Sequence, residues 1–268
     1  MLSRLFLFII NISPNIKKIA WYHWYQILAK KHNKKDWTFM NYGYTNSNII
    51  KRISLMPEDL ENRLLIQLYH HVASKVPIKE KKVLEIGSGR GGGANYITKY
   101  LNPNSMVGVD ISDNAVQFCK KTHKINKLDF KIGDAENLPF ENNLFDTVIN
   151  VESSHCYGNF SLFLNEVHRV LIPNGYLSLC DLRSKEAAIE MEQQLEASNF
   201  KIIKKEIITE SVLLALDEIS DRKSSTIKTN VPAWIRDSFM DFAGAKGTRI
   251  YNGFKSGEIM YLSYVLQK

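Results

Sequence analysis

The sequence predicts a doubly wound α/β fold, in which a seven-stranded, mostly parallel sheet carries helices on both faces. Short apolar runs alternate with helical patterns between residues 81 and 209, as in parallel strands joined by crossover helices. The first run leads into V-L-E-I-G-S-G-R-G-G-G at 83–93, where a strand ends in a glycine turn that opens a helix. A last apolar run, I-M-Y-L-S-Y-V-L-Q, lies within 258–267. Together these features indicate one large α/β domain.

The elements follow in order from the local signals. Pro57 and the acids after it favour a helix over 57–74, which Pro77 ends. Ser112 is a natural N-cap for the second helix of the alternating region. Strands are expected at 83–87, 106–110, 128–132, 145–151, 176–182 and 200–209, and helices at 91–101, 112–123, 160–171 and 185–197, with a tight turn at Pro173-Asn-Gly175.

The stretch 210–257 interrupts the alternation with helical, polar and glycine-bearing sequence. It is too irregular for a plain crossover helix, so we expect the last strand to pair antiparallel at the sheet edge. The sequence thus divides into a helical N-terminal cap over 1–56 and a main domain over 57–268. Within the main domain, 210–257 is expected to form a lid insertion over the substrate.

Charge is concentrated at the N-terminus. The chain has a net charge of +7, but residues 1–52 hold nine Lys/Arg against one acid, and the other 216 residues hold 26 against 27. A nearly neutral main domain argues against a nucleic-acid partner. Three scattered cysteines fit a reducing, cytoplasmic protein and make neither a disulfide framework nor a metal site.

The N-terminal segment combines an apolar run with aromatic residues and lysines. The run at 2–12 is too short to span a bilayer and is not followed by a cleavage site. Two interpretations stay open for residues 1–35. They form an interfacial helix pair on an anionic membrane, giving peripheral contact at the inner membrane face, or a cap whose rings pack on the domain.

The glycine turn indicates a nucleotide-type cofactor. Glycines at 87, 89 and 92 satisfy G-x-G-x-x-G, the dinucleotide fingerprint of Rossmann-like folds. Asp110 ends the second strand, where its carboxylate can accept hydrogen bonds from two ribose hydroxyls. Both features fit NAD and S-adenosylmethionine equally well.

Two acids favour S-adenosylmethionine over NAD. Glu85 lies within an apolar strand end, and burying a carboxylate there is costly without a partner such as the amino group of a methionine moiety. Asp134, after the third strand, can accept from an adenine amine while the Ala135 N–H donates to the ring. We therefore expect S-adenosylmethionine to be the cofactor.

These motifs make the sequence similar to a known family. Glu85-x-Gly-x-Gly, Val-x-x-Asp110, Gly-Asp134-Ala-Glu-x-Leu-Pro-Phe and Phe-Asp-x-Val resemble class I S-adenosylmethionine-dependent methyltransferases. The runs N-V-E-S-S-H-C-Y at 150–157 and L-C-D-L-R at 179–183, with N-Y-G-Y at 41–44, resemble the phthiotriol/phenolphthiodiolone dimycocerosate O-methyltransferases. One departure is Pro-Asn174-Gly in place of Pro-Gly-Gly, although Asn also tolerates a positive φ.

The resemblance implies roles for particular residues. His155, just past the fourth strand, corresponds to the general base of related sugar O-methyltransferases, and Asp181 to the acid that supports its ring. A neutral histidine is suited to take the proton of an alcohol acceptor. The expected cofactor-binding residues are Glu85, Gly87, Gly89, Gly91, Asp110, Ile111, Asp134, Ala135 and Asn150. Tyr42, Tyr44, Tyr157 and Trp234, with Phe239 in the lid, are expected to shape an apolar acceptor pocket.

The sequence therefore predicts a methyltransferase that methylates a hydroxyl of an apolar small molecule of lipid or polyketide type, without a metal. Methylation of carbon or nitrogen in a quinone, sterol or other metabolite is the first alternative. A non-catalytic cofactor-binding or scaffold protein is the second. Neither the acceptor nor the oligomeric state follows from the residues.

Overall fold

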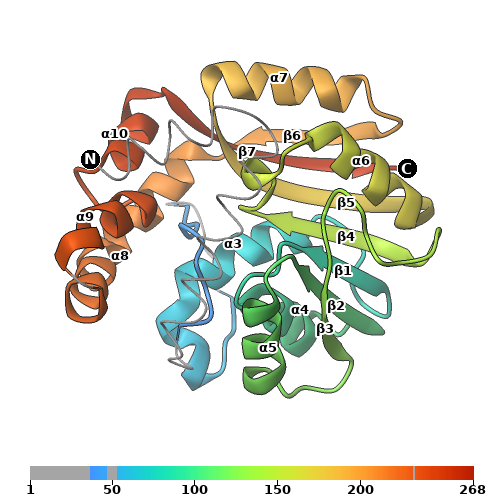
Figure 1. Cartoon of the computed structure of the whole chain (residues 1–268), viewed down its shortest axis with the longest axis horizontal. Helices are drawn as coiled ribbons and strands as arrows, with labels where there is room; N and C mark the ends of the chain where they lie inside the picture. The colour runs from blue at the N-terminus through green and yellow to red at the C-terminus, as the bar shows by residue number, and fades with distance from the viewer. Residues whose placement is uncertain (1–36, 47–52, 232) are drawn as a thin grey trace.

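The computed structural model describes residues 37–46, 53–231 and 233–268, and within them it forms a seven-stranded sheet between layers of helices (Figure 1). Most of the predicted cap, including residues 1–35, lies outside the described residues. The strands are β1 (Lys82–Ile86), β2 (Ser105–Asp110), β3 (Leu128–Ile132), β4 (Phe145–Val151), β5 (Leu171–Ser184), β6 (Lys201–Ile207) and β7 (Ile259–Gln267). The helices are η1 (Pro57–Asn62), α3 (Arg63–Ala73), α4 (Gly92–Leu101), α5 (Asp113–Thr122), η2 (Ser154–Cys156), α6 (Phe160–Val170), α7 (Lys185–Glu196), α8 (Thr209–Asn230), α9 (Ala233–Phe242) and α10 (Arg249–Ser256).

The sheet has the strand order β3-β2-β1-β4-β5-β7-β6. Strands β1 to β5 run parallel, whereas β7 pairs antiparallel with both β5 and β6. This confirms the predicted Rossmann-like fold with an antiparallel C-terminal strand. The expectation that the last strand lies at the edge is wrong, because β7 is inserted between β5 and β6 and leaves β6 outermost.

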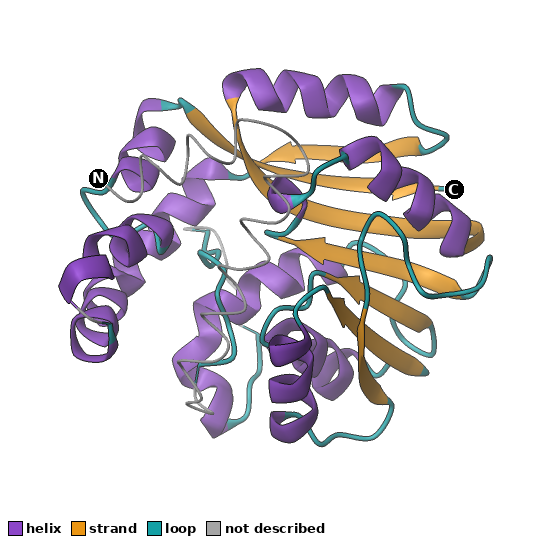
Figure 2. Cartoon of the chain, in the orientation of Figure 1, coloured by secondary structure: helices purple, strands orange, loops and turns teal. Residues whose placement is uncertain are grey.

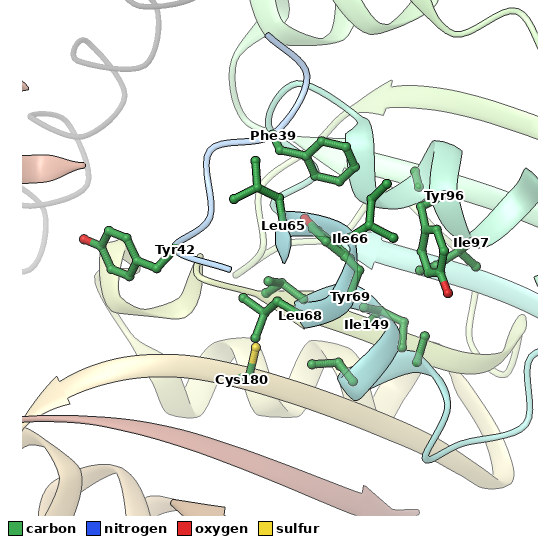
Figure 3. Close-up of a cluster of buried hydrophobic side chains, with 14 of the residues drawn as sticks. Phe39, Tyr42, Leu65, Ile66, Leu68, Tyr69, Tyr96, Ile97, Ile149 and Cys180 are labelled. Carbon is green, nitrogen blue, oxygen red and sulfur yellow. The ribbon is translucent and has the colours of Figure 1, made fainter. Parts of the chain in front are cut away.

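Two apolar cores fill the two faces of the sheet, as strand alternation requires. On β1, Val83 packs with the core under α3 and α4, and Leu84 packs with the core under α6 and α7. Figure 2 shows these helix layers on opposite sides of the orange strands. Figure 3 shows part of the first core, where Leu65, Leu68 and Tyr69 of α3 gather with Ile149 of β4.

Most predicted bounds agree with the structure, and two differ. The expected helix over 57–74 begins with the 3-10 segment η1 before α3 starts at Arg63. The expected turn at 173–175 is an irregularity within β5, because Leu171 already pairs with Phe145 of β4 before the register shifts. Asn174 there has φ +62°, the conformation that Asn tolerates better than most residues.

The stretch after β6 is helical. Helices α8, α9 and α10 contact one another, and α8 and α10 also contact β7 (Figure 1). Phe239 is buried in a small cluster with Val231, Ile227 and Trp37, so it anchors α9 to α8 and to the N-terminal segment. Within the described ranges, no helix has both the length and the hydropathy needed to cross a membrane.

Candidate active site

A cavity lies at the carboxyl ends of the parallel strands, where ligands bind in doubly wound sheets. Its walls come from the loops after β1, β2, β3 and β4, from Leu182 of β5 and from residues 38–42. We call residues 37–46 the strap, because they run across this cavity. Nine of the predicted site residues line it: Tyr42, Gly87, Gly89, Asp110, Ile111, Asp134, Ala135, His155 and Tyr157.

The first glycine of the turn must be glycine for two reasons. Gly87 has φ +75°, and a Cβ atom there would lie 1.8 Å from the Ser153 Oγ. The Gly87 N–H and the Ser88 N–H both donate to the carbonyl of Val109, which ties the turn to β2. Glycine at this position therefore leaves room for the Ser153 side chain, and the turn packs against the loop after β4 at the cavity wall.

The later glycines serve helix packing instead. A Cβ atom on Gly91 would come within 3.0 Å of His123, Phe130 and Cys119, and one on Gly93 would lie 1.9 Å from the Tyr69 ring. Gly91 is the left-handed N-cap of α4 and does not line the cavity. Its predicted place among the cofactor-contacting residues is therefore not what the structure shows.

Asp110 connects the turn to the start of α5. Its Oδ2 accepts from the Gly89 N–H at 2.8 Å, and its Oδ1 accepts from the Ser112 N–H at 2.9 Å. Burial raises the pKa of this carboxyl, and the two N–H donors act in the opposite direction. Each carboxylate oxygen has a second lone pair, so Asp110 can still accept a ribose hydroxyl in the cavity that it lines.

Glu85 lies behind the turn and does not line the cavity. Strand alternation places it on the α3/α4 face of β1, fully buried. Neither carboxylate oxygen has an ordinary hydrogen bond within the described part of the chain. Burial raises its pKa to about 8, and the Tyr69 hydroxyl and the Ala94 N–H, which approach it without ordinary hydrogen-bond geometry, offset this only in part. Direct contact between Glu85 and a ligand amino group, as predicted, is not what this placement provides.

Asn150 also lies in the wall rather than at the cavity. Its Nδ2 donates to the Ile86 carbonyl at 2.9 Å and to the Tyr157 hydroxyl at 2.9 Å. The same hydroxyl lies 2.7 Å from the Ser153 Oγ, against Gly87. Tyr157 therefore lines the cavity beside the glycine turn.

His155 and Asp181 form a pair at the cavity wall, in which Asp181 is buried and His155 is partly exposed. The His155 Nδ1 lies 2.7 Å from the Asp181 Oδ1, and the His155 backbone N–H donates to Oδ2 at 2.8 Å. Asp181 does not line the cavity, and it also accepts from the Ser154 Oγ and pairs with Arg183 at 3.0 Å. The carboxylate thus holds the imidazole through Nδ1 and, by a second hydrogen bond, the backbone of the same residue.

The charges of this pair depend on each other. Burial alone lowers the pKa of His155, but Cys156 and the Asp181 carboxylate raise it, to about 10. Burial alone raises the pKa of Asp181, but His155 and Arg183 hold it well below its usual range. These neighbours therefore favour the protonated imidazole, although the sequence predicts a neutral ring.

The predicted acceptor residues are placed differently from one another. Tyr42 lines the cavity, whereas Tyr44 stacks on His71 with ring centroids 4.3 Å apart and does not reach it. Trp234 belongs to α9, but its side chain lies outside the described residues. Phe239 is buried in the α8/α9 cluster, and Phe242, one helical turn later, lines the cavity instead.

Sequence reasoning missed several lining residues, of which Glu152 and Phe242 are the most informative. Glu152 follows β4 and has φ +48°, which no local pattern indicates. Glu152 precedes Ser153 by one residue and His155 by three, and this closeness to a predicted site residue is the signal in the sequence that could have placed it at the cavity. The strap itself was indicated only through the N-Y-G-Y resemblance at 41–44.

The family of this chain follows from comparison with known proteins. The family model described as a methyltransferase domain matches residues 78–234, which include the glycine turn, Asp110, Asp134 and His155. The chain belongs to the S-adenosylmethionine-dependent methyltransferases, and S-adenosylmethionine is its cofactor.

Within this family the chain resembles enzymes named for lipid substrates. It is 36% identical over 256 residues to the phthiotriol/phenolphthiotriol dimycocerosates methyltransferase of Mycobacterium tuberculosis, covering 96% of this chain and 94% of the relative. It is 34% identical over 259 residues to the fatty-acid O-methyltransferase of Mycolicibacterium smegmatis, covering 97% and 92%. The predicted resemblance to the dimycocerosate methyltransferases is confirmed.

Solved structures share the fold at low sequence identity. The [4+2]-cyclase SpnF superposes with a TM-score of 0.72 at 18% identity, covering 92% of this chain and 94% of that one. The mycolic acid cyclopropane synthase CmaA1, solved with S-adenosylhomocysteine, gives 0.70 at 13% identity, covering 90% and 95%. At such identities the likeness concerns the fold.

Proposed function

We propose that this methyltransferase transfers a methyl group to a hydroxyl of an apolar, lipid-type acceptor. The observation that carries the proposal is the His155–Asp181 pair, which places an oriented imidazole at the wall of the cavity that holds the glycine turn. Tyr42, Leu182 and Phe242 line the same cavity and supply apolar surface. The lipid names of the two relatives support the acceptor class.

In this proposal the cofactor is held at the β1–β3 side of the cavity. Gly87 and Gly89 offer an open backbone, Asp110 with Ile111 lies at the ribose, and Asp134 with Ala135 lies at the adenine. Glu85, Gly91 and Asn150 support the turn from behind. When bound, S-adenosylmethionine supplies an electrophilic methyl group on a sulfonium ion.

His155 then has the role of general base. Asp181 occupies its Nδ1, so Nε2 is the ring atom that would take the acceptor's hydroxyl proton. The ring has to be neutral for this, and a second positive charge in the same cavity favours the neutral form. The strap and Phe242 restrict water at the point where the proton moves.

Replacement of His155 tests the proposal. We expect His155→Ala to lower the rate of methyl transfer to a long-chain secondary alcohol by about 10²- to 10⁴-fold. The affinity for S-adenosylmethionine, measured by calorimetry, should stay within about threefold, because His155 belongs to the β4 side of the cavity. Unchanged turnover of the alcohol would remove His155 from the reaction and favour methylation of carbon or nitrogen.

One observation favours a second candidate, methyl esterification of a fatty acid. A carboxylate is already ionised at neutral pH and needs no base, and the protonated His155 provides a cation that can bind it. The fatty-acid O-methyltransferase among the relatives agrees with this acceptor.

The pH profile separates the two candidates, because Cys156 and the Asp181 carboxylate raise the pKa of His155 to about 10. For an alcohol, kcat/KM should rise with pH from 7 towards 10 as the neutral base becomes populated. For a fatty acid of the same chain length, kcat/KM should fall over the same interval as the binding cation is lost. His155→Gln should flatten either profile, and a profile that keeps its slope in this variant would assign the titration to another group.

A further inference from the structure

Glu152 adopts a backbone conformation that its residue type disfavours. It has φ +48°, although it carries a full side chain, and it follows β4 at the cavity wall. A residue other than glycine in the left-handed region costs free energy, and surrounding contacts must hold it there. The contacts of the Glu152 side chain therefore hold this backbone conformation in place.

The carboxylate of Glu152 joins three segments that are distant in sequence. Its Oε1 accepts from the Tyr42 backbone N–H at 2.8 Å and from the Tyr261 hydroxyl at 2.6 Å. The Glu152 backbone N–H donates to the Cys180 carbonyl of β5 at 2.9 Å. These hydrogen bonds fasten the strap, β4 and β7 to one another at this point.

Through Tyr42 the connection continues into the helices after β6. The Tyr42 hydroxyl donates to the Phe242 carbonyl at the end of α9, at 2.9 Å. Its ring meets the edge of Phe254 in α10, with centroids 5.7 Å apart. In Figure 3 the Tyr42 side chain points away from Leu65, Leu68 and Tyr69, whereas Phe39 of the same strap packs on the Tyr69 ring, with centroids 5.9 Å apart.

In the proposed function these contacts lie on the acceptor side of the cavity. The cofactor elements lie at the ends of β1, β2 and β3, whereas Glu152 and His155 follow β4 and Leu182 belongs to β5. Tyr42 and Phe242, which the connection holds, line the same cavity. The Thr38 carbonyl of the strap accepts from the Gly92 N–H beside the glycine turn, so that part of the strap has its own attachment. A change at Glu152 should therefore alter the acceptor opening before it alters the cofactor site.

We propose that Glu152 is a positioning residue that latches the strap and the end of α9 across the cavity and so sets the opening through which the acceptor binds. The acceptor part of this inference rests on the proposed function. The latch itself does not, because the position of the strap can be measured without any acceptor.

Three variants test the latch. Glu152→Ala removes the acceptor oxygen, Glu152→Gln keeps an oxygen at the same reach, and Tyr261→Phe removes one of the two hydrogen bonds while leaving Glu152 in place. Glu80→Ala is the matched control, because Glu80 is also a glutamate with positive φ, +61°, but it precedes β1 at the opposite end of the sheet. It reports the effect of alanine in that backbone conformation alone.

Amide hydrogen exchange of residues 38–46 and steady-state kinetics are the readouts. For Glu152→Ala we expect exchange of the strap, above all of the Tyr42 N–H, to accelerate at least tenfold. The KM for a long-chain secondary alcohol should rise about tenfold, the effect of losing one strong hydrogen bond, while kcat and the Kd of S-adenosylmethionine change less than threefold. Glu152→Gln should bring strap exchange and KM most of the way back to the wild-type values. Tyr261→Phe should give values between those of the wild type and Glu152→Ala, and Glu80→Ala should leave both as in the wild type.

The opposite results overturn the proposal in distinct ways. If strap exchange in Glu152→Ala and Tyr261→Phe matches the wild type, Glu152 does not hold the strap. If Glu152→Gln is as impaired as Glu152→Ala and both lose kcat with KM unchanged, Glu152 acts by its charge on the reaction and is no latch. If the wild-type protein does not methylate the alcohol, the proposed function fails. The hydrogen-exchange rates of the strap in the variants then still show whether Glu152 holds the strap.

Discussion

Asp181 carries the negative charge that both His155 and Arg183 face, and its side chain is fully buried. Removing one partner of a buried ion pair leaves the others without compensation. We expect Asp181→Asn to lower the free energy of unfolding by about 3 kcal/mol at pH 6, measured by urea denaturation. Asn keeps the size of the side chain, so the loss reports charge rather than packing.

The same variant should show a defined pH dependence. The folded-state pKa of His155 is raised to about 10, so the stability that it gains from Asp181 is complete below its unfolded value near 6.5 and is lost as pH rises towards 10. The stability difference between wild type and Asp181→Asn should therefore shrink between pH 6.5 and 10. It should not vanish, because Arg183 stays charged. A difference that is constant over this interval would contradict the raised pKa of His155.

A residue of the cavity wall can be predicted from the sequence where a motif fixes both the residue and its place along a strand. Asp110 and Asp134 line the cavity because they follow β2 and β3, and His155 does so because it follows β4. Glu85 differs, because strand alternation turns it to the buried helix side one residue before the strand ends. Glu152 could not be predicted, because its partners Tyr42 and Tyr261 are about 110 residues away in each direction.

At the scale of single elements, the start of α5 connects a helix cap to the cofactor site. The Ser112 Oγ accepts from the Ala115 N–H at 3.2 Å, which confirms the predicted N-cap, and the Ser112 N–H donates to Asp110. We expect Ser112→Ala to cost about 1 kcal/mol of stability and to weaken S-adenosylmethionine binding about threefold in calorimetry. Fraying of the first turn would loosen Ile111 and Asp110 at the cavity.

Ser184 offers the matched control for this cap. Its Oγ accepts from the Ala187 N–H at 3.2 Å at the start of α7, and Ser184 does not line the cavity. Ser184→Ala should lose a similar free energy of unfolding, measured in the same urea titration, with cofactor affinity unchanged. Equal effects of the two variants on cofactor binding would show that α5 has no special coupling to the site.

The hydrophobic patterns of the last two strands differ in a way that fits their order in the sheet. The β6 sequence K-I-I-K-K-E-I leaves Ile203 and Ile207 exposed and carries the lysines typical of an edge strand. The β7 sequence I-M-Y-L-S-Y-V-L-Q is almost continuously apolar, as in a strand covered on both faces. Hydrophobic patterns thus identify each strand, but strand order also depends on the non-local pairing of β7 with β5, which the local pattern does not contain.

At the scale of the whole molecule, the net positive charge and an apolar run are concentrated at the N-terminus, apart from the methyltransferase domain. Residues 1–52 carry a net charge of +8, and the rest of the chain carries −1. Basic residues near an anionic lipid surface each contribute about 1 kcal/mol, and salt screens this attraction. Residues 1–35 lie outside the described part of the structure, so the argument for a membrane role rests on the sequence.

We propose that this segment brings the enzyme to anionic membranes, where lipid-type acceptors are found. In sedimentation with vesicles, the full chain should bind those rich in anionic lipid at least tenfold more strongly than neutral ones, and binding should weaken as salt increases. A chain lacking residues 1–16 keeps most of the lysines but loses the apolar run, so it should lose affinity for both kinds of vesicle. If this shortened chain sedimented as well as the full one, the apolar run would not be the anchor. If salt had no effect on the full chain, the lysines would have no part in binding, and a cap packed on the domain would be the better interpretation of the segment.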